Sequence, residues 1–247
     1  MNKIVFEAPV FNLEAALEAA EFGIDRLELC SNFPEGGETP SSGMLSFLKE
    51  EIRIPVFVMI RPRGGDFVYS QKELMVMKKD IERLGDHGAD GFVFGILDSQ
   101  GKVNTEACEI LIRSASGKPC TFHRAFDASS DLHDSLEKVM GCGFERILSS
   151  GGKNTTTEGL DTLFELMVKA QDQISIMPGG GTKPEHVSIL KESGYLKEIH
   201  ASCKKWKLSP NEYIRPGLSF SDDPKSFTHH LRVDRNLVNE FLEVIKE

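Results

Sequence analysis

The sequence predicts a single (β/α)8 barrel that spans residues 1–247. Eight short runs of β-branched and apolar residues alternate with segments of helical periodicity along the whole chain, a pattern typical of βαβ units around a parallel sheet. A length of 247 residues suits an α/β barrel, which routinely forms one domain of about 250 residues. No Pro/Gly/Ser-rich hinge divides the chain near its middle, and Ala8–Val10 stands where an open dinucleotide-binding sheet needs a glycine-rich turn. These observations favour a closed barrel over an open sheet.

The predicted strands are the short apolar runs, of which IVFE near the N-terminus is the first. They lie about 20 to 36 residues apart, which leaves room for one helix between neighbouring strands. The eight runs begin near Ile4, Arg26, Val56, Gly91, Cys120, Arg146, Ile174 and Glu198.

The predicted helices carry apolar residues at spacings of three and four. They cover Leu13–Glu21, Met44–Glu51, Lys72–Leu84, Thr105–Ser114, Leu132–Met140, Gly159–Gln171, Pro184–Glu192 and Arg235–Ile245. Several end at a glycine, as at Gly23, Gly88, Gly143 and Gly194, where a left-handed residue lets the chain reverse. One segment breaks this rhythm, because Lys204–Asp234 separates the eighth strand from the last helix as a long irregular connection. Connections of that length usually have a function or cover something.

The composition excludes several classes of protein. The formal net charge of −9 repels phosphate backbones and anionic lipid surfaces, so we expect no nucleic-acid partner and no membrane partner. The five cysteines are widely spread and contain no C-x-x-C pair, so they predict neither a disulfide framework nor a zinc finger. Reduced thiols fit a cytoplasmic protein. Because Glu7 interrupts the N-terminal apolar residues and no apolar run reaches about 18 residues, we expect neither export nor membrane insertion.

Ionisable residues stand at the ends of five predicted strands, where barrel enzymes place their active sites. Because side chains alternate along a strand, Leu27 and Leu29 should face the helices and Glu28 the barrel mouth. The same alternation directs Glu7, Arg61, His123 and His200 inward. Burying these charges costs several kcal/mol unless they pair, so their convergence predicts a catalytic site. The alternative is that each residue has a structural role and forms an ion pair or hydrogen bond that fills the polar end of the barrel.

Three segments could hold a small anion. After the third predicted strand, Arg61 and Arg63 flank a proline and are followed by a pair of glycines. The arginines could make bidentate contacts to an anion, and the glycines leave backbone amides free to donate to it. Glycine-rich turns also follow the sixth strand, at Ser149–Gly152, and the seventh strand, ahead of a helix, where barrels often bind phosphate. The expected anion-binding residues are Arg61, Arg63, Gly179, Gly180 and Gly181. A tight turn remains the alternative interpretation of the glycines.

Four motifs resemble the CutC copper-homeostasis family. They are RLELC at Arg26–Cys30, EGGETPS at Glu35–Ser41, PVFVMIRPRGGDFVYS at Pro55–Ser70 and TFHRAFD at Thr121–Asp127. The resemblance covers nearly the whole chain. It implies a cytoplasmic (β/α)8 barrel that forms a homo-oligomer, a dimer or tetramer, and that binds or traffics Cu(I), without an established reaction.

The resemblance also implies a copper site. Family proteins often carry a cysteine shortly after the first-strand glutamate, which together with the cysteine ending the second strand is a proposed copper site. Here Ala8 occupies the first position and Cys30 the second. Cu(I) prefers thiolate or thioether ligands, so Cys30 is the metal-ligand candidate and needs Met59, a histidine or a partner subunit beside it.

Three functions therefore stand side by side. The first is copper homeostasis with Cu(I) bound at Cys30. The second is an enzyme in which Arg61 and Gly179–Gly181 bind a small anionic or phosphorylated metabolite while Glu28 or His123 moves protons. The third is a binding platform whose Lys204–Asp234 segment packs on another subunit through Trp206, Tyr213 and Phe220, since aromatic residues are enriched at interfaces.

Overall fold

A barrel of eight parallel strands forms the centre of the molecule, as the sequence predicts. The computed structural model describes residues 3–218 and 223–246. The hydrogen-bonding order is β7-β6-β5-β4-β3-β2-β1-β8, and its two end strands lie beside each other, so the sheet curls into a nearly closed barrel. The strands are β1 (Val5–Val10), β2 (Arg26–Leu29), β3 (Val56–Met59), β4 (Gly91–Phe94), β5 (Cys120–Phe122), β6 (Arg146–Ser149), β7 (Ser175–Pro178) and β8 (Glu198–His200).

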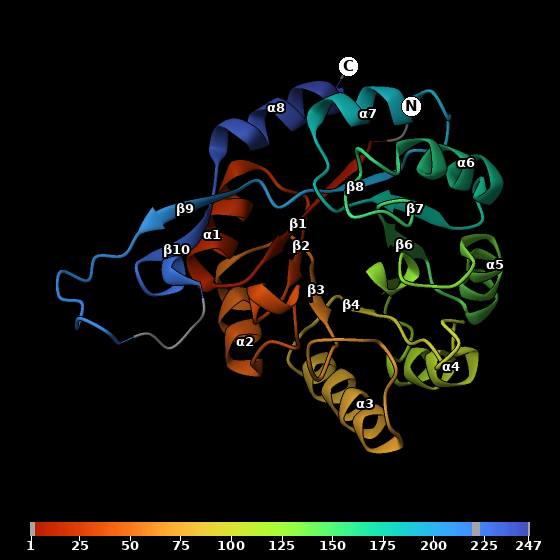
Figure 1. Cartoon of the computed structure of the whole chain (residues 1–247), viewed down its shortest axis with the longest axis horizontal. Helices are drawn as coiled ribbons and strands as arrows, with labels where there is room; N and C mark the ends of the chain where they lie inside the picture. Colours follow the sequence, from red (N-terminus) through yellow and green to blue (C-terminus); the bar gives the residue numbers. More distant parts are fainter. Residues whose placement is uncertain (1–2, 219–222, 247) are drawn as a thin grey trace.

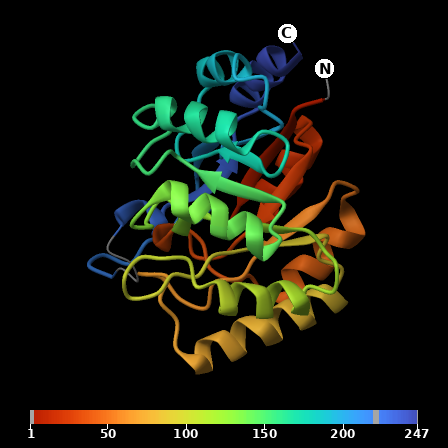
Figure 2. The same cartoon turned by 90° about the vertical axis from the view of Figure 1, so that its right-hand side faces the viewer.

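In the described part of the chain, eight helices are present, and they surround the strands as an outer layer (Figures 1 and 2). They are α1 (Leu13–Phe22), α2 (Ser42–Glu51), α3 (Gln71–Asp86), α4 (Thr105–Ser114), α5 (Leu132–Cys142), α6 (Leu160–Ala170), α7 (Pro184–Lys191) and α8 (Arg235–Lys246). Short 3-10 turns are η1 (Phe33–Glu35), η2 (Arg124–Phe126) and η3 (Pro224–Phe227). Within the described ranges, no helix is both long and apolar enough to cross a bilayer.

Side-chain alternation along the strands separates two apolar regions. Leu27 and Leu29 are fully buried in the large core between strands and helices, and burial of each such side chain stabilises the fold by about 2 kcal/mol. A smaller cluster fills part of the barrel interior and contains Cys30, Phe57 and Met59. Residues two apart on one strand share a face, so this alternation determines whether a polar side chain points into the barrel or towards the helices.

The lower part of the barrel interior is closed by an ion-pair network. Arg26 on β2 bonds to Glu7 and Glu198, and Arg146 on β6 bonds to Glu198 at 3.2 Å. Both guanidinium groups lie over the ring of Phe57, at 4.7 and 4.9 Å from its centroid. Because each buried charge has an opposite charge beside it, the network avoids the several-kcal/mol cost of an unpaired ion. It forms a fixed floor beneath the barrel mouth.

The Lys204–Asp234 segment, which we call the hairpin segment, is only partly irregular, which corrects the sequence-based expectation. It contains an antiparallel hairpin of β9 (Lys204–Leu208) and β10 (His229–Val233) that projects from the barrel (Figure 1). Arg232 anchors the hairpin to α1 through Glu18 at 2.6 Å. The mixed, lysine-rich sequence of β9 lacks the apolar alternation by which strands are recognised, so sequence periodicity did not indicate it.

Candidate active site

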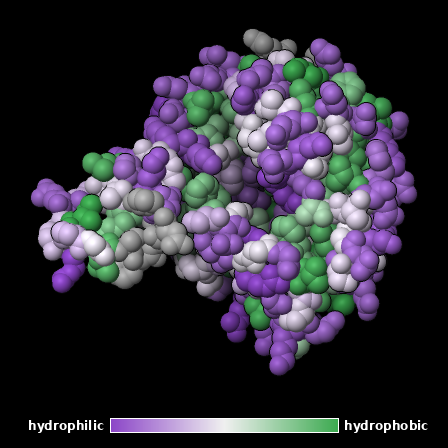
Figure 3. Space-filling model, viewed as in Figure 1, coloured by the Kyte–Doolittle hydropathy of each residue, from purple (hydrophilic) through white to green (hydrophobic). Residues whose placement is uncertain are grey.

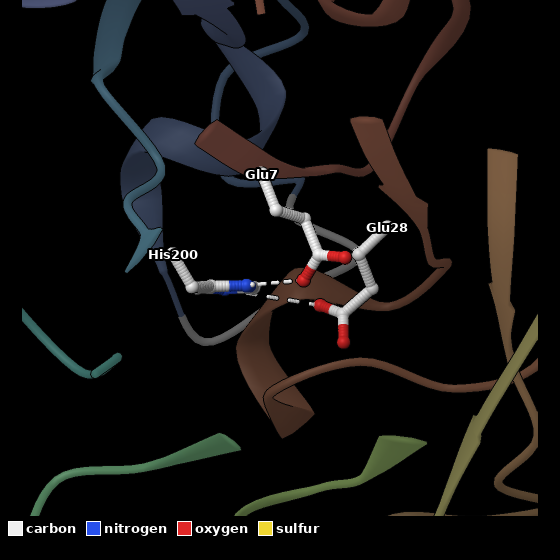
Figure 4. A group of neighbouring side chains, drawn as sticks. All are labelled: Glu7, Glu28 and His200. Carbon is white, nitrogen blue, oxygen red and sulfur yellow. Dashed lines mark hydrogen bonds and ion pairs between the residues drawn. The ribbon is translucent and has the colours of Figure 1, made fainter. Parts of the chain in front are cut away.

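Three buried ionisable side chains meet at the mouth of the barrel (Figure 4). Glu7 on β1 lies between its two neighbouring strands, since it is paired in register with His200 on β8 and with Arg26 on β2. Its Oε1 lies 2.9 Å from His200 Nδ1, and His200 Nε2 lies 3.9 Å from Glu28 Oε2. The structure thus brings together three of the five predicted catalytic residues in direct contact.

The two glutamates have opposite electrostatic surroundings. Burial alone would raise the pKa of Glu7, but the charge of Arg26 and the hydrogen bond and charge of His200 bring that pKa down to about 2. Burial raises the pKa of Glu28 to about 7, opposed by the charge of His200 and supported by the negative charge of Glu7. For His200, burial lowers the pKa, but the hydrogen bond to Glu7 and the charge of Glu28 raise it overall. Glu28 therefore titrates near neutral pH.

The orientation of His200 follows from these charges. Since Glu7 is ionised, it can only accept a hydrogen bond, so Nδ1–H of His200 donates to it. A carboxylate that holds one imidazole nitrogen in this way fixes the orientation of the ring and directs the other nitrogen away from it. In His200 the other nitrogen is Nε2, which faces Glu28. This pair can take up and release one proton at neutral pH, which is the requirement for general acid–base catalysis.

A cavity of about 610 Å³ opens above this pair. Its position coincides with the hollow at the centre of the molecular face in Figure 3. Glu28, His200, His123 and Arg61 line its polar part. The apolar part includes Phe11, Phe33, Phe67 and Leu148, and the basic side chains of Arg124, Lys183 and Lys204 contribute further lining. This mixture of apolar walls and few polar groups is typical of sites for small molecules.

His123 lies at the end of β5 and is buried beside the cavity. The backbone N–H of Ala125 donates to its Nδ1 at 3.2 Å. Its ring packs on Phe67, with 4.9 Å between centroids, and lies where a side chain at Gly95 would collide with it at 2.7 Å. Burial and then the positive charge of Arg61 lower the pKa of His123 to about 3. His123 is consequently a neutral imidazole and a poor base.

Arg61 holds two loops in place and also lines the cavity. Its Nη1 donates to the carbonyls of Glu35 and Gly37, at 2.5 and 3.0 Å, and its Nη2 donates to the carbonyl of Gly65 at 2.7 Å. These contacts use three of the five N–H donors of the guanidinium and hold it in place, whereas Nε has no hydrogen-bond acceptor among the described residues. Arg61 therefore supplies a fixed positive charge to the cavity.

The other predicted anion-binding residues separate into two groups. Gly180 and Gly181 line the cavity, whereas Gly179 does not. Both lining residues have positive φ, 98° and 76°, a conformation that favours glycine. Arg63 lies outside the cavity, because its guanidinium is paired with Glu73 at 2.6 Å and with Asp66 at 3.1 Å.

The glycine-rich turn after β6 already holds an anion of the protein itself. Asp127, at the end of the TFHRAFD motif, accepts hydrogen bonds from Ser149 Oγ at 2.6 Å and from the amides of Ser150 and Gly152 at 3.0 Å. Arg124 pairs with the same carboxylate at 2.8 Å. A side-chain carboxylate thus occupies the amides that the sequence suggested for phosphate, and only the turn after β7 remains available.

The residues near Glu28 can be tested against the metal that the family resemblance implies. Among the described residues, Glu7, Glu28 and His200 are one set whose ligand atoms lie within 4.8 Å of one another. Two carboxylates and an imidazole suit divalent ions better than Cu(I), which prefers sulfur. The softer donors are the Cys30 thiol, 3.6 Å from Glu28 Oε2, and the Met59 thioether in the same cluster. Burial, followed by the charge of Glu28, raises the pKa of Cys30 well above its usual value, which opposes the thiolate that Cu(I) requires.

Ala8 does not face this site. It is fully buried in the core between strands and helices, on the opposite side of β1 from Glu7. Three other charged residues of the interior were missed by the sequence analysis: Arg26, Arg146 and Glu198. They stand at the starts of strands, whereas the active sites of barrel enzymes lie at the carboxyl ends. The same alternation would have found Arg26, which lies two residues before Glu28.

Comparisons of the sequence and of the structure with known proteins identify the same family. The family model described as "CutC family" matches residues 4–205. The human "Copper homeostasis protein cutC homolog" is 44% identical over 224 residues, which cover 89% of this chain and 82% of the human protein. A family protein CutC from Xylella fastidiosa (strain Temecula1) is 41% identical over 198 residues, covering 80% of this chain and 74% of that protein. The crystal structure of CutC from Streptococcus agalactiae superposes with a TM-score of 0.75 at 37% identity, covering 81% of this chain and 98% of that one. The chain belongs to the CutC family.

Proposed function

We propose that this CutC-family chain is an enzyme that moves protons on a small anionic molecule bound at the barrel mouth. The observation that carries this proposal is the pair formed by Glu28 and His200, whose Oε2 and Nε2 lie 3.9 Å apart beside a cavity of about 610 Å³. Glu7 holds the His200 ring in one orientation, and burial raises the pKa of Glu28 to about 7. A base with a pKa near the working pH is the most effective kind.

The anionic character of the substrate is supported by the turn after β7. The amides of Gly180 and Gly181 have no hydrogen-bond acceptor among the described residues, and both residues line the cavity ahead of α7. Lys183 and Arg124 contribute positive charge to the same cavity. Free amides of a glycine turn beside basic side chains favour a phosphate or carboxylate group.

The test is turnover of a library of phosphorylated and carboxylated metabolites, followed by NMR. We expect at least one compound to be consumed by the wild type, and its consumption to fall at least about 100-fold in Glu28→Gln, because general acid–base catalysis contributes 10²–10⁴. Glu165→Gln, an exposed position on α6, is the matched control and should keep the wild-type rate. Equal rates for Glu28→Gln and wild type, or no compound consumed, would reject the proposal.

Copper binding is a second candidate, favoured by one observation. A Cβ atom at Gly37 would lie 3.2 Å from Cys30 Sγ and 3.5 Å from Met59 Cε, so the two sulfur side chains flank the same point. A thiolate and a thioether are ligands that Cu(I) accepts. The names of the curated relatives point in the same direction.

Titration with Cu(I) against a competing chelator tests this candidate. If the sulfur pair binds copper, the wild type takes up one equivalent, Cys30→Ser and Met59→Leu lose it, and the buried control Cys142→Ser keeps it. Ala8→Cys should add no binding, because position 8 faces the helices. No uptake by the wild type above that of Cys30→Ser would exclude copper binding at this position.

We also infer a cytoplasmic homo-oligomer. All five cysteines are free and buried, as suits a reducing compartment. The projecting hairpin segment exposes Leu208 and Tyr213, and β9 carries three lysines on a chain of net charge −9. These features suit contact with a second copy of the same acidic chain.

A further inference from the structure

Three of the polar atoms that lack a hydrogen-bond partner among the described residues belong to residues lining one cavity. They are Glu28 Oε1, Arg61 Nε and His123 Nε2. All three side chains are more than nine-tenths buried. A buried polar atom without a partner costs about 1–3 kcal/mol, so a ligand in the cavity that supplied hydrogen-bond partners to these side chains would remove this cost. The set contains two donors and one acceptor.

The donor state of His123 follows from its contacts. The Ala125 amide donates to Nδ1, so Nδ1 carries the lone pair and Nε2 carries the hydrogen. Burial and the charge of Arg61 keep the pKa of His123 at about 3, so the ring stays neutral at physiological pH. It can therefore polarise an oxygen atom of a ligand but cannot act as the base.

The cavity offers no activated nucleophile among the described residues. Burial raises the pKa of Cys203, another lining residue, to about 12, and the pKa of Cys30 is also raised. Thiols in this state are unreactive. The lysines that line the cavity, Lys183 and Lys204, have exposed side chains rather than desolvated ones, which is not the environment that activates a lysine. The chemistry left to these side chains is proton transfer with stabilisation of a developing oxyanion.

We propose that His123 is a catalytic hydrogen-bond donor to a carbonyl oxygen of the substrate, and that Glu28 removes a proton from the carbon next to that carbonyl. The inference rests on the proposed function and specifies its substrate class, a carbonyl compound with an acidic group. The C–H bond breaks and its proton goes to Glu28, while its electron pair forms a C=C bond and the carbonyl π electrons move to the oxygen. The resulting enolate oxygen accepts from His123 Nε2–H beside the positive charge of Arg61, and return of the proton from Glu28 or His200 completes the step without any redox partner.

Hydrogen–deuterium exchange tests this step directly. The protein is incubated in D2O with a panel of 2-oxo acids and phosphorylated hydroxyketones, beginning with pyruvate and dihydroxyacetone phosphate, and loss of the α-proton signal is followed by NMR. We expect exchange by the wild type, and a decrease of about 100-fold or more in His123→Leu, the size seen when one oxyanion donor is removed. His123→Gln, which keeps an N–H group, should retain more activity than His123→Leu.

The controls separate this inference from the proposed function. His133→Leu, an exposed position on α5, should exchange at the wild-type rate, and circular dichroism melting confirms that each variant is folded. An unchanged rate in folded His123→Leu, or no exchange of any panel member by the wild type, would overturn the role of His123. Turnover of a library compound without a carbonyl, still dependent on Glu28, would reject this inference and leave the proposed function standing.

Discussion

At the scale of single residues, two glutamates on neighbouring strands acquire different roles from their surroundings. Glu7 lies against Arg26 and His200, which hold its pKa near 2, whereas burial raises the pKa of Glu28, opposed by the more distant His200 and the weak hydrogen bond of the Cys30 thiol. One carboxylate is therefore a permanent anion that orients an imidazole, and the other exchanges its proton near neutral pH. Separation of the pKa values of paired groups is a common way to assign acid and base.

The raised pKa of Glu28 predicts a pH-dependent stability. Its value moves from 4.5 in the unfolded chain to about 7 in the folded one, so the folded state binds the extra proton between these values. Stability from this group is complete below pH 4.5 and is lost as the pH rises to 7. Glu28→Gln should remove this loss. The free energy of unfolding of the variant, relative to that of the wild type, should therefore increase by up to about 3 kcal/mol as the pH rises from 4 to 8. Denaturant titrations at five pH values would show it, and parallel curves would contradict it.

Sequence alternation identified the inward-facing residues on strands but not the orientation of loop residues. Glu7, Glu28 and His200 converge because a period of two puts every second side chain inside a barrel. Arg63 stands in a loop, where no periodicity fixes a direction, and it pairs with Glu73 on α3 instead of reaching the cavity. The protonation states were also beyond the sequence, since the pKa of His123 depends on burial and on the nearness of Arg61.

At the scale of elements, the η2 turn and the β6–α6 loop act as one unit. Asp127 closes η2 and accepts from Ser149, Ser150 and Gly152, which come directly from β6. A charged acceptor bonded to several donors is worth more than neutral hydrogen bonds. The TFHRAFD motif therefore positions His123 at its start and fixes the neighbouring loop at its end.

Loss of this carboxylate should destabilise the fold. Asp127→Ala leaves buried amides and a hydroxyl without their acceptor, so we expect a decrease of about 3 kcal/mol in the free energy of unfolding. Asp134→Ala, which removes an exposed ion pair with Lys138, should cost less than about 1 kcal/mol. Thermal or denaturant unfolding measures both, and similar effects of the two substitutions would argue against the structural role of Asp127.

The regular elements of the barrel were predictable because local patterns coincide with the fold. The helix at Thr105–Ser114 has the predicted bounds, and the others differ by one or two residues at an end, where caps and fraying blur the pattern. The hairpin was not predicted, because β9 reads KKWKL and its exposed positions carry no apolar face. Its formation depends on pairing with β10, about 25 residues later in the chain.

At the scale of the whole molecule, the hairpin segment is the feature that departs from a compact barrel. It extends away from the helices (Figure 1), and apolar side chains are visible on it in Figure 3. Trp206 packs edge-on against Phe33, with 6.0 Å between centroids, whereas Tyr213 is 70% exposed. Phe220, the third aromatic residue suggested for an interface, lies outside the described residues. The outer part of the segment is therefore the part available to a second copy.

The double substitution Leu208→Asp/Tyr213→Asp tests the homo-oligomer. We expect the wild type to sediment as a dimer or tetramer and the variant as a monomer, since charge at an apolar contact opposes its burial. Met75→Asp places a charge at another exposed apolar position, on α3, and should sediment as the wild type does. A monomeric wild type at micromolar concentration would refute assembly through the hairpin segment.

Contact between Trp206 and Phe33 has a practical consequence. Trp206 is the only tryptophan of the chain, and its neighbour Phe33 is part of the cavity wall. Any molecule that enters and displaces Phe33 must alter the surroundings of the indole ring. Intrinsic tryptophan fluorescence therefore offers a label-free signal of occupancy with which unknown ligands can be screened.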